Sequence, residues 1–127
     1  MYYIDASAFL KLIVKEIETQ SLLATLPKDL FSSEILTVEV LRTIVRTDGE
    51  TLEKARKRLR KVGFIPADSE VLSVAALFGE HVKSKTLDSI HLASAISMGP
   101  NLKGLITYDK TMITDAKKLG IPVLSPA

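Results

Sequence analysis

The chain lacks cysteine altogether, and histidine occurs only at His81 and His91 among its 127 residues. Without cysteine there can be no disulfide and no thiolate metal site, and the composition suits a reducing interior. Two histidines are too few for a histidine-rich zinc site. If the protein uses a metal, the ligands must therefore be oxygen atoms, which favours Mg²⁺ or Mn²⁺.

A long apolar run is also missing. No apolar stretch approaches the ~20 residues that span a membrane, and the amino-terminal residues have neither the basic start nor the cleavage site of a signal peptide. We therefore expect a cytoplasmic protein with no membrane partner. The composition, 46% hydrophobic and 25% charged, predicts one globular domain over residues 1–127, and the net charge of +2 is too small to indicate nucleic-acid binding by itself.

Short apolar segments alternate with segments of helical periodicity along the chain. We predict strands at about 2–5, 30–32, 63–66, 102–107 and 121–124. Helices are expected at about 7–15, 18–26, 34–46, 50–62, 68–82, 84–98 and 110–119, with breaks at Asp48-Gly49 and Gly120, and with Ser33, Asp68 and either Ser84 or Thr86 as N-caps. Such alternation is typical of an α/β protein in which helices cover both faces of a parallel sheet.

Two of these strands are followed directly by an aspartate. Asp5 comes after the apolar residues 2–4, and Asp109 follows the strand-like residues 104–108. Parallel strands open their carboxyl ends onto one edge of the sheet, where open α/β proteins bind ligands, so we expect both carboxylates at that edge. Asp109 could instead be a helix N-cap, a position that aspartate favours. Asp115, six residues later, is expected to be a helix-surface acid.

The helix expected at 34–46 is apolar around most of its circumference, which predicts that it is largely buried. Glu39, Arg42 and Arg46 fall in its narrow polar sector. Either Glu39 belongs to a site, with the two arginines beside it to contact phosphate, or the sector is an exposed stripe with a Glu39–Arg42 ion pair worth ~0.2–0.5 kcal/mol. Glu34 points ~140° away from Glu39 and cannot share a site with it.

Asp88 lies near the start of the helix expected at 84–98, and its helix face also holds His91, Leu92 and Ala95. A carboxylate beside two apolar residues suggests a functional group. The alternative is a first-turn acid that complements the helix dipole. His91 could be a metal ligand, but a core histidine bonded to backbone is the preferred interpretation.

Asp5, Glu39, Asp88 and Asp109 would form a cluster of four carboxylates from four separate segments. Such a cluster repels itself and raises several pKa values unless cations balance it. Hard divalent cations do so, and two of them ~3.5–4 Å apart would activate water and stabilise the leaving oxygen in phosphodiester cleavage. Ser7 and Thr107, close in sequence to Asp5 and Asp109, could supply hydroxyls to ligand or water, or could simply begin a helix and end a strand.

Four segments resemble, in order, the motifs of PIN-domain ribonucleases and especially of the VapC toxins. They are Tyr3-Ile4-Asp5-Ala6-Ser7-Ala8, Ser33-Glu34-Ile35-Leu36-Thr37-Val38-Glu39-Val40-Leu41-Arg42, Leu87-Asp88-Ser89-Ile90-His91-Leu92-Ala93 and Ile106-Thr107-Tyr108-Asp109. The resemblance covers nearly the whole chain and implies a three-layer α/β/α sandwich with a central, mainly parallel sheet of four to five strands. It also implies an endoribonuclease dependent on Mg²⁺ or Mn²⁺, with Asp5, Glu39, Asp88 and Asp109 as the acidic site. Homodimers and a small antitoxin that inserts a segment near the site are implied as well.

The main alternative is a PIN scaffold that binds RNA or a protein partner without cleaving it. A phosphoacceptor receiver domain fits poorly, because Asp5 is followed by Ala6-Ser7 rather than by a second acid and Asp68 has the wrong context for an acceptor. A phosphatase with an aspartyl nucleophile would need a second aspartate where Ser7 stands. The basic run from Lys54 to Lys61 is interpreted as a solvated helix, with RNA-phosphate contact as the alternative.

Overall fold

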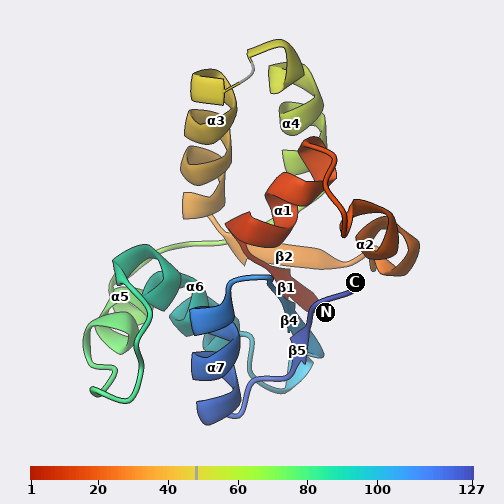
Figure 1. Cartoon of the computed structure of the whole chain (residues 1–127). Coiled ribbons are helices and arrows are strands. Elements are labelled where there is room, and N and C mark those ends of the chain that lie inside the picture. The colour runs from red at the N-terminus through yellow and green to blue at the C-terminus, as the bar shows by residue number, and fades with distance from the viewer. Residues whose placement is uncertain (48) are drawn as a thin grey trace.

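Five short strands form a parallel sheet at the centre of the protein (Figure 1). They are β1 (Tyr2–Ile4), β2 (Leu30–Ser33), β3 (Gly63–Ile65), β4 (Gly104–Ile106) and β5 (Val123–Leu124). Their order in the sheet is β3-β2-β1-β4-β5, and every neighbouring pair is parallel. The computed structural model describes residues 1–47 and 49–127, so the first residue of the break predicted at Asp48-Gly49 lies outside the described residues.

Successive strand residues point to opposite faces of the sheet and build two cores. Ile4 and Ile106 enter one core, whereas Tyr3 and Leu105 enter the other. The face of Ile4 is covered by α1 (Ala6–Ile13), α2 (Thr19–Thr25), α3 (Ile35–Thr47) and α4 (Leu52–Leu59). The face of Tyr3 is covered by α6 (Thr86–Ser97) and α7 (Lys110–Lys118), with α5 (Ser69–Ala76) packed on α6. The three-layer α/β/α sandwich and the number of strands are confirmed.

Helices α3 and α4 pack side by side and extend together beyond the sheet (Figure 1). Leu36, Val40 and Ile44 form the buried stripe of α3, while Val38 and Val45 on the same helix are 59% and 62% exposed. The expectation that this helix is largely buried is therefore wrong, because its outer half has no layer above it. Short 3-10 helices precede α4 (η1, Gly49–Thr51) and follow α6 (η2, Gly99–Asn101). No helix of the described residues is both long and apolar enough to cross a membrane.

The segment after α5 departs most from the predicted helices. A helix was expected to continue to about Val82, but α5 ends at Ala76. Val82 packs instead into the core on the Tyr3 face, and the backbone N–H groups of Lys83 and Ser84 donate to the Asp115 carboxylate. Tertiary contacts therefore replace the helix that the local pattern favoured.

Helix caps were predicted with mixed success. Asp68 caps α5 as expected, with its Oδ1 accepting from the Val71 N–H at 3.0 Å. Neither Ser84 nor Thr86 caps α6, whose N-cap is Lys85, because the Ser84 hydroxyl donates to Asp115 Oδ2 at 2.6 Å. At the end of α7, Gly120 has a φ of 76°, the left-handed conformation that glycine adopts at low cost.

Candidate active site

The candidate site lies at the point in the sheet where the strand order reverses. From β1 the chain adds β2 and β3 on one side, then crosses to add β4 and β5 on the other side. Open α/β sheets bind ligands at the carboxyl ends of the strands on either side of such a reversal, here β1 and β4, and we call this edge of the sheet the crevice. Asp5 follows β1, and Thr107 and Asp109 follow β4, so all three occupy that crevice.

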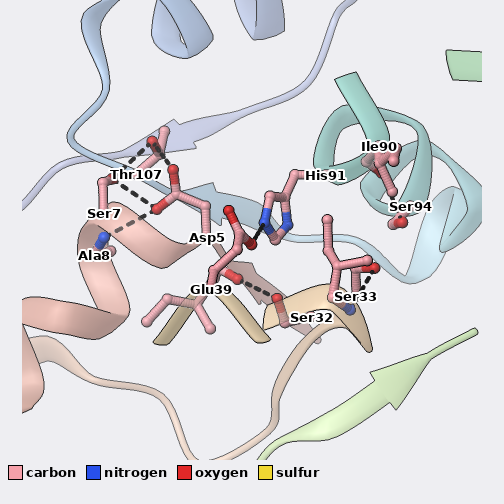
Figure 2. A network of polar contacts seen from close by, with 12 residues as sticks. Asp5, Ser7, Ala8, Ser32, Ser33, Glu39, Ile90, His91, Ser94 and Thr107 are labelled. Carbon is pink, nitrogen blue, oxygen red and sulfur yellow. Dashed lines mark hydrogen bonds and ion pairs between the residues drawn. The ribbon is translucent and has the colours of Figure 1, made fainter. Parts of the chain in front are cut away.

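Asp5 is buried, and both oxygens of its carboxylate accept hydrogen bonds (Figure 2). As the N-cap of α1, its Oδ1 accepts from the Ala8 N–H at 3.0 Å and from the Ser7 hydroxyl at 2.8 Å. Its Oδ2 accepts from the Thr107 hydroxyl at 2.6 Å. Burial raises the pKa of Asp5 above its ordinary value, and these hydrogen bonds oppose the rise only in part. A carboxylate held in place under this cost is suited to receive a cation.

Ser7 and Thr107 join the two strand ends. The Ser7 hydroxyl donates to Asp5 and accepts from the Tyr108 N–H at 3.0 Å. The Thr107 hydroxyl donates to Asp5 and accepts from the Asp109 N–H at 3.1 Å. Both hydroxyls are thus occupied within the protein, and both act on the orientation of Asp5.

Asp109 is the N-cap of α7, with its Oδ1 accepting from the Met112 N–H at 2.8 Å. The alternative that Asp109 is a helix N-cap is therefore confirmed. Capping uses only Oδ1, and Oδ2 has no hydrogen bond among the described residues. The charge of Asp109 also acts on Asp88. Capping one helix and contributing to a site are compatible for this residue.

Asp88 is half-buried in the first turn of α6 and has no hydrogen-bond partner within residues 1–47 and 49–127. Burial, together with repulsion from Asp109, Asp5 and more weakly Glu39, raises the pKa of Asp88 to about 6, while His91 opposes the rise. The charges of the other three predicted acids therefore all act on Asp88. Their catalytic and metal-binding roles stay predictions.

The Glu39 side chain extends from α3 and contacts His91 of α6 (Figure 2). Its Oε1 lies 2.6 Å from His91 Nε2. On the other side of the ring, His91 Nδ1 lies 2.6 Å from the Tyr3 hydroxyl. His91 is buried, but it binds side chains on both nitrogens, so the preferred interpretation of a histidine bonded to backbone is wrong. Glu39 likewise pairs with His91 rather than with Arg42.

The sequence did not single out Tyr3. Burial raises the pKa of Tyr3 far above its usual range, so its hydroxyl keeps its proton, and that oxygen accepts from the Ser33 N–H at 2.9 Å. A tyrosine where a buried strand would accept phenylalanine signals a polar partner for its hydroxyl. That signal was present but could not name the partner.

Arg42 and Arg46 line a groove of about 500 Å³ beside Glu39. Its other lining residues come from α1, α3 and the start of α6: Ala6, Leu10, Val38, Thr43 and Leu87. Both arginines are exposed, and neither forms an ion pair within the described part of the chain. They are therefore free to meet an anion that enters along the groove.

Two other predicted features lie apart from these acids. Asp115 is buried rather than on the helix surface, and its carboxylate accepts hydrogen bonds from three donors: the backbone N–H groups of Lys83 and Ser84 and the Ser84 hydroxyl. Burial raises the pKa of Asp115, but those hydrogen bonds outweigh it and lower the pKa below its ordinary value.

The basic run on α4 is largely exposed, with Arg56 paired to Glu53 at 3.2 Å, as the solvated-helix interpretation predicted.

The four acids offer the type of ligand atom that hard divalent cations prefer. All four acids offer oxygen, and Asp88, Glu39 Oε2 and Asp109 Oδ2 are not used by hydrogen bonds in the described residues. Within residues 1–47 and 49–127, no three His, Asp or Glu side chains lie close enough to enclose an ion as they stand.

Comparison with known proteins identifies the family. The family model of the PIN domain matches residues 2–118. Ribonuclease VapC46 of Mycobacterium tuberculosis is 37% identical over 130 aligned positions, which cover 98% of this chain and 97% of that protein. Ribonuclease VapC47 of the same species is 31% identical over 134 positions, covering 99% and 97%. The chain therefore belongs to the PIN-domain family and, within it, to the VapC-like ribonucleases, as the sequence resemblance predicted.

Two solved structures share the fold at lower identity. A toxin–antitoxin complex from Klebsiella pneumoniae matches with a TM-score of 0.78 and 23% identity, covering 100% of this chain and 98% of that one. The Mycobacterium tuberculosis toxin VapC20, described as cleaving the sarcin–ricin loop, matches with a TM-score of 0.78 and 15% identity, covering 99% and 100%. Both confirm the architecture over its full length.

Proposed function

We propose that this protein is a metal-dependent endoribonuclease and the toxin of a toxin–antitoxin pair, with Asp5, Glu39, Asp88 and Asp109 as its metal-binding site. The observation that carries the proposal is that four separate segments bring carboxylates to one place: Asp5 after β1, Asp109 after β4, Glu39 on α3 and Asp88 on α6. The environment of Asp88 shows the consequence. Its pKa is raised to about 6 by burial and by the charges of Asp109 and Asp5, and no hydrogen bond within the described residues offsets that cost. An acid in this position destabilises the metal-free protein and becomes favourable when a cation is bound.

The oxygen donors favour Mg²⁺, with Mn²⁺ as the second choice. When bound, such a cation polarises water and neutralises charge on the phosphate. Asp5 is the fixed point of the site, because three hydrogen bonds hold its two oxygens. We assign Ser7 and Thr107 to holding Asp5 rather than to contacting RNA, since both hydroxyls are already engaged.

RNA would approach along the groove beside Glu39. Arg42 and Arg46 present two exposed cations there, next to the acids rather than among them. Guanidinium groups pair with phosphate through two hydrogen bonds, so these arginines would hold the backbone of the strand being cut. Their contribution should weaken with salt, as phosphate contacts do.

An antitoxin partner is supported by the VapC-like relatives and by the toxin–antitoxin complex that shares the fold. We infer that the chain also forms homodimers and that residues 1–127 act as one domain. A cytoplasmic location stays a prediction of the sequence.

The test is cleavage of a structured RNA pool by the purified chain after any bound partner has been removed. The reaction is run with Mg²⁺, with Mn²⁺ and with chelator, beside Asp5→Asn and Asp88→Asn. We expect cleavage that needs metal and that falls about 100-fold or more in either variant, since each removes charge from the reacting centre. Glu70→Gln, which changes a first-turn acid of α5, is the matched control and should cleave like wild type.

The same experiment distinguishes the proposed nuclease from the alternative, a PIN scaffold that binds without cleaving. That alternative predicts RNA or partner binding without cleavage at any metal concentration, and no difference between wild type and the two variants. Cleavage that persists in chelator, or that Asp88→Asn leaves unchanged, would show that the activity comes from another site or from a contaminant.

A further inference from the structure

The contact between His91 and Glu39 is a short, buried polar interaction that the proposed chemistry does not itself explain. His91 is fully buried, the Glu39 side chain is 17% exposed, and the Nε2–Oε1 distance is 2.6 Å. The two residues are 52 positions apart in the sequence and come from helices on opposite faces of the sheet. Such a contact fixes the Glu39 side chain to a rigid part of the fold.

The hydrogen-bond directions follow from what each partner can do. The Glu39 carboxylate only accepts, so His91 Nε2 must carry the hydrogen. In the neutral ring with its hydrogen on Nε2, Nδ1 is an acceptor, so the Tyr3 hydroxyl donates to it at 2.6 Å while the Tyr3 oxygen accepts from the Ser33 N–H. Tyr3 and His91 also pack edge to face, with ring centroids 5.7 Å apart. Strand β1 therefore fixes both the ring orientation of His91 and its tautomer.

The groove explains why Glu39 needs to be held. Arg42 lies one helical turn after Glu39 on α3, and Arg46 lines the same groove one turn further on. Without His91, the flexible Glu39 side chain could turn toward Arg42 and leave the acids of the crevice. With His91 in place, Oε1 is bonded and Oε2 is the oxygen left for the site.

We propose that His91 is a positioning residue: through Nε2–H it holds Glu39 toward the acids of the crevice and away from Arg42, with Tyr3 orienting the ring. The inference rests on the proposed function, because it treats Glu39 as a metal ligand. Partners of this kind, which orient a ligand without touching the metal, typically change metal affinity by ~10–100-fold when they are removed.

The test measures how tightly Mn²⁺ binds to wild type, His91→Leu and His91→Gln. Each is the full chain without RNA, and binding is followed by the effect of Mn²⁺ on water-proton relaxation. His91→Leu removes the donor at similar volume, and His91→Gln keeps an amide N–H that can reach Glu39. We expect His91→Leu to weaken Mn²⁺ binding ~10–100-fold and His91→Gln to restore most of the affinity. RNA cleavage by His91→Leu should recover as Mn²⁺ is raised, because the ligand is misplaced rather than removed.

Two controls separate positioning from general damage. Leu92→Val perturbs the buried face of the same helix without touching Glu39, and His81→Leu removes the other histidine at an exposed position. Both should bind Mn²⁺ like wild type. Equal affinity in wild type and His91→Leu would overturn the inference, and so would a loss in His91→Gln as large as that in His91→Leu.

A measurement on the wild-type chain serves if His91→Leu does not fold. The ¹⁵N shifts of the imidazole, recorded at pH 8, report which ring nitrogen carries the hydrogen; we expect Nε2, and a hydrogen on Nδ1 alone would overturn the inference. Failure of the two proposals is distinguishable. Wild type that binds Mn²⁺ in a His91-dependent way but cuts no RNA refutes the nuclease alone, whereas wild type that binds no Mn²⁺ refutes both.

Discussion

Replacing Asp88 with asparagine should make the metal-free protein more stable while it removes activity. Asparagine is nearly isosteric with aspartate and carries no charge, so Asp88→Asn relieves the repulsion from Asp109 and Asp5 and the cost of burying a charge. Because Asp88 accepts no hydrogen bond from the described residues, little is lost in exchange. The same substitution removes a carboxylate from the proposed metal site.

The size of the effect follows from the pKa of Asp88. A rise from the ordinary 3.8 to about 6 corresponds to ~3 kcal/mol at ~1.36 kcal/mol for each pKa unit. Screening by solvent at this half-exposed position and the favourable helix N-terminus, worth ~0.3–1 kcal/mol, both reduce it. We expect a gain of about 1 kcal/mol at pH 7.5, or a rise in Tm of roughly 4 °C.

The stability difference between Asp88→Asn and wild type should depend on pH, and the raised pKa fixes the direction of that dependence. A raised pKa in the folded state means that the stabilising contribution of Asp88 is complete below pH 3.8 and is lost as the pH rises through about 6. The difference between Asp88→Asn and wild type should therefore be near zero at pH 4 and reach its full size above pH 7. Thermal unfolding in chelator measures it, and added Mn²⁺ should stabilise wild type more than the variant.

Glu70→Gln provides the control for this series. Glu70 occupies the first turn of α5 as Asp88 occupies that of α6, so its loss should cost a few tenths of a kcal/mol through the helix dipole. If Asp88→Asn also destabilises the metal-free protein at pH 7.5, or if the difference does not change with pH, then Asp88 is an ordinary first-turn acid and the reasoning is refuted.

Three further substitutions test other parts of the structure. Asp115→Asn weakens the hydrogen bonds to Lys83 and Ser84 and should cost about 1.5–3 kcal/mol in urea unfolding. Since the pKa of Asp115 is lowered, that cost should be present near neutral pH and shrink as the pH falls below the ordinary aspartate range; an unchanged midpoint would contradict this. Thr107→Val should cost about 1–3 kcal/mol, because Asp5 loses a donor and the Asp109 N–H loses its acceptor, and a neutral result would show that water replaces both. Gly120→Ala should lower stability by about 1 kcal/mol, given its φ of 76°, and an equal or higher Tm would refute this.

Much of the fold follows from patterns that act locally. Alternating apolar strands and amphipathic helices predicted the parallel α/β class, and an acid directly after β1 and soon after β4 predicted which edge carries the site. The order of the strands does not follow from such patterns, since pairing of β1 with both β2 and β4 joins residues far apart in the chain. The resemblance to PIN domains predicted the three layers and the number of strands, but it was not used to predict the order of the strands.

Apart from the exposed outer half of α3, the errors share one cause, which is a partner distant in sequence. Asp115 has the spacing of a helix-surface residue, but the loop around Lys83 and Ser84 folds over it and buries it. That same loop ends α5 early and takes Ser84 away from capping α6. His91 was recognised as buried, yet its partners Tyr3 and Glu39 lie on other elements, and no helical pattern could identify them.

The most direct test of the account is to locate the metal. A crystal of the protein grown with Mn²⁺ and measured at the manganese absorption edge should show an anomalous peak in the crevice between β1 and β4, within coordination distance of Asp5 and of at least two of the other three acids. Asp88→Asn crystals grown at the same Mn²⁺ concentration should show a weaker peak or none. A strong Mn²⁺ peak elsewhere on the chain, or an empty crevice at a Mn²⁺ concentration that supports RNA cleavage, would contradict the assignment of these four carboxylates as the active site.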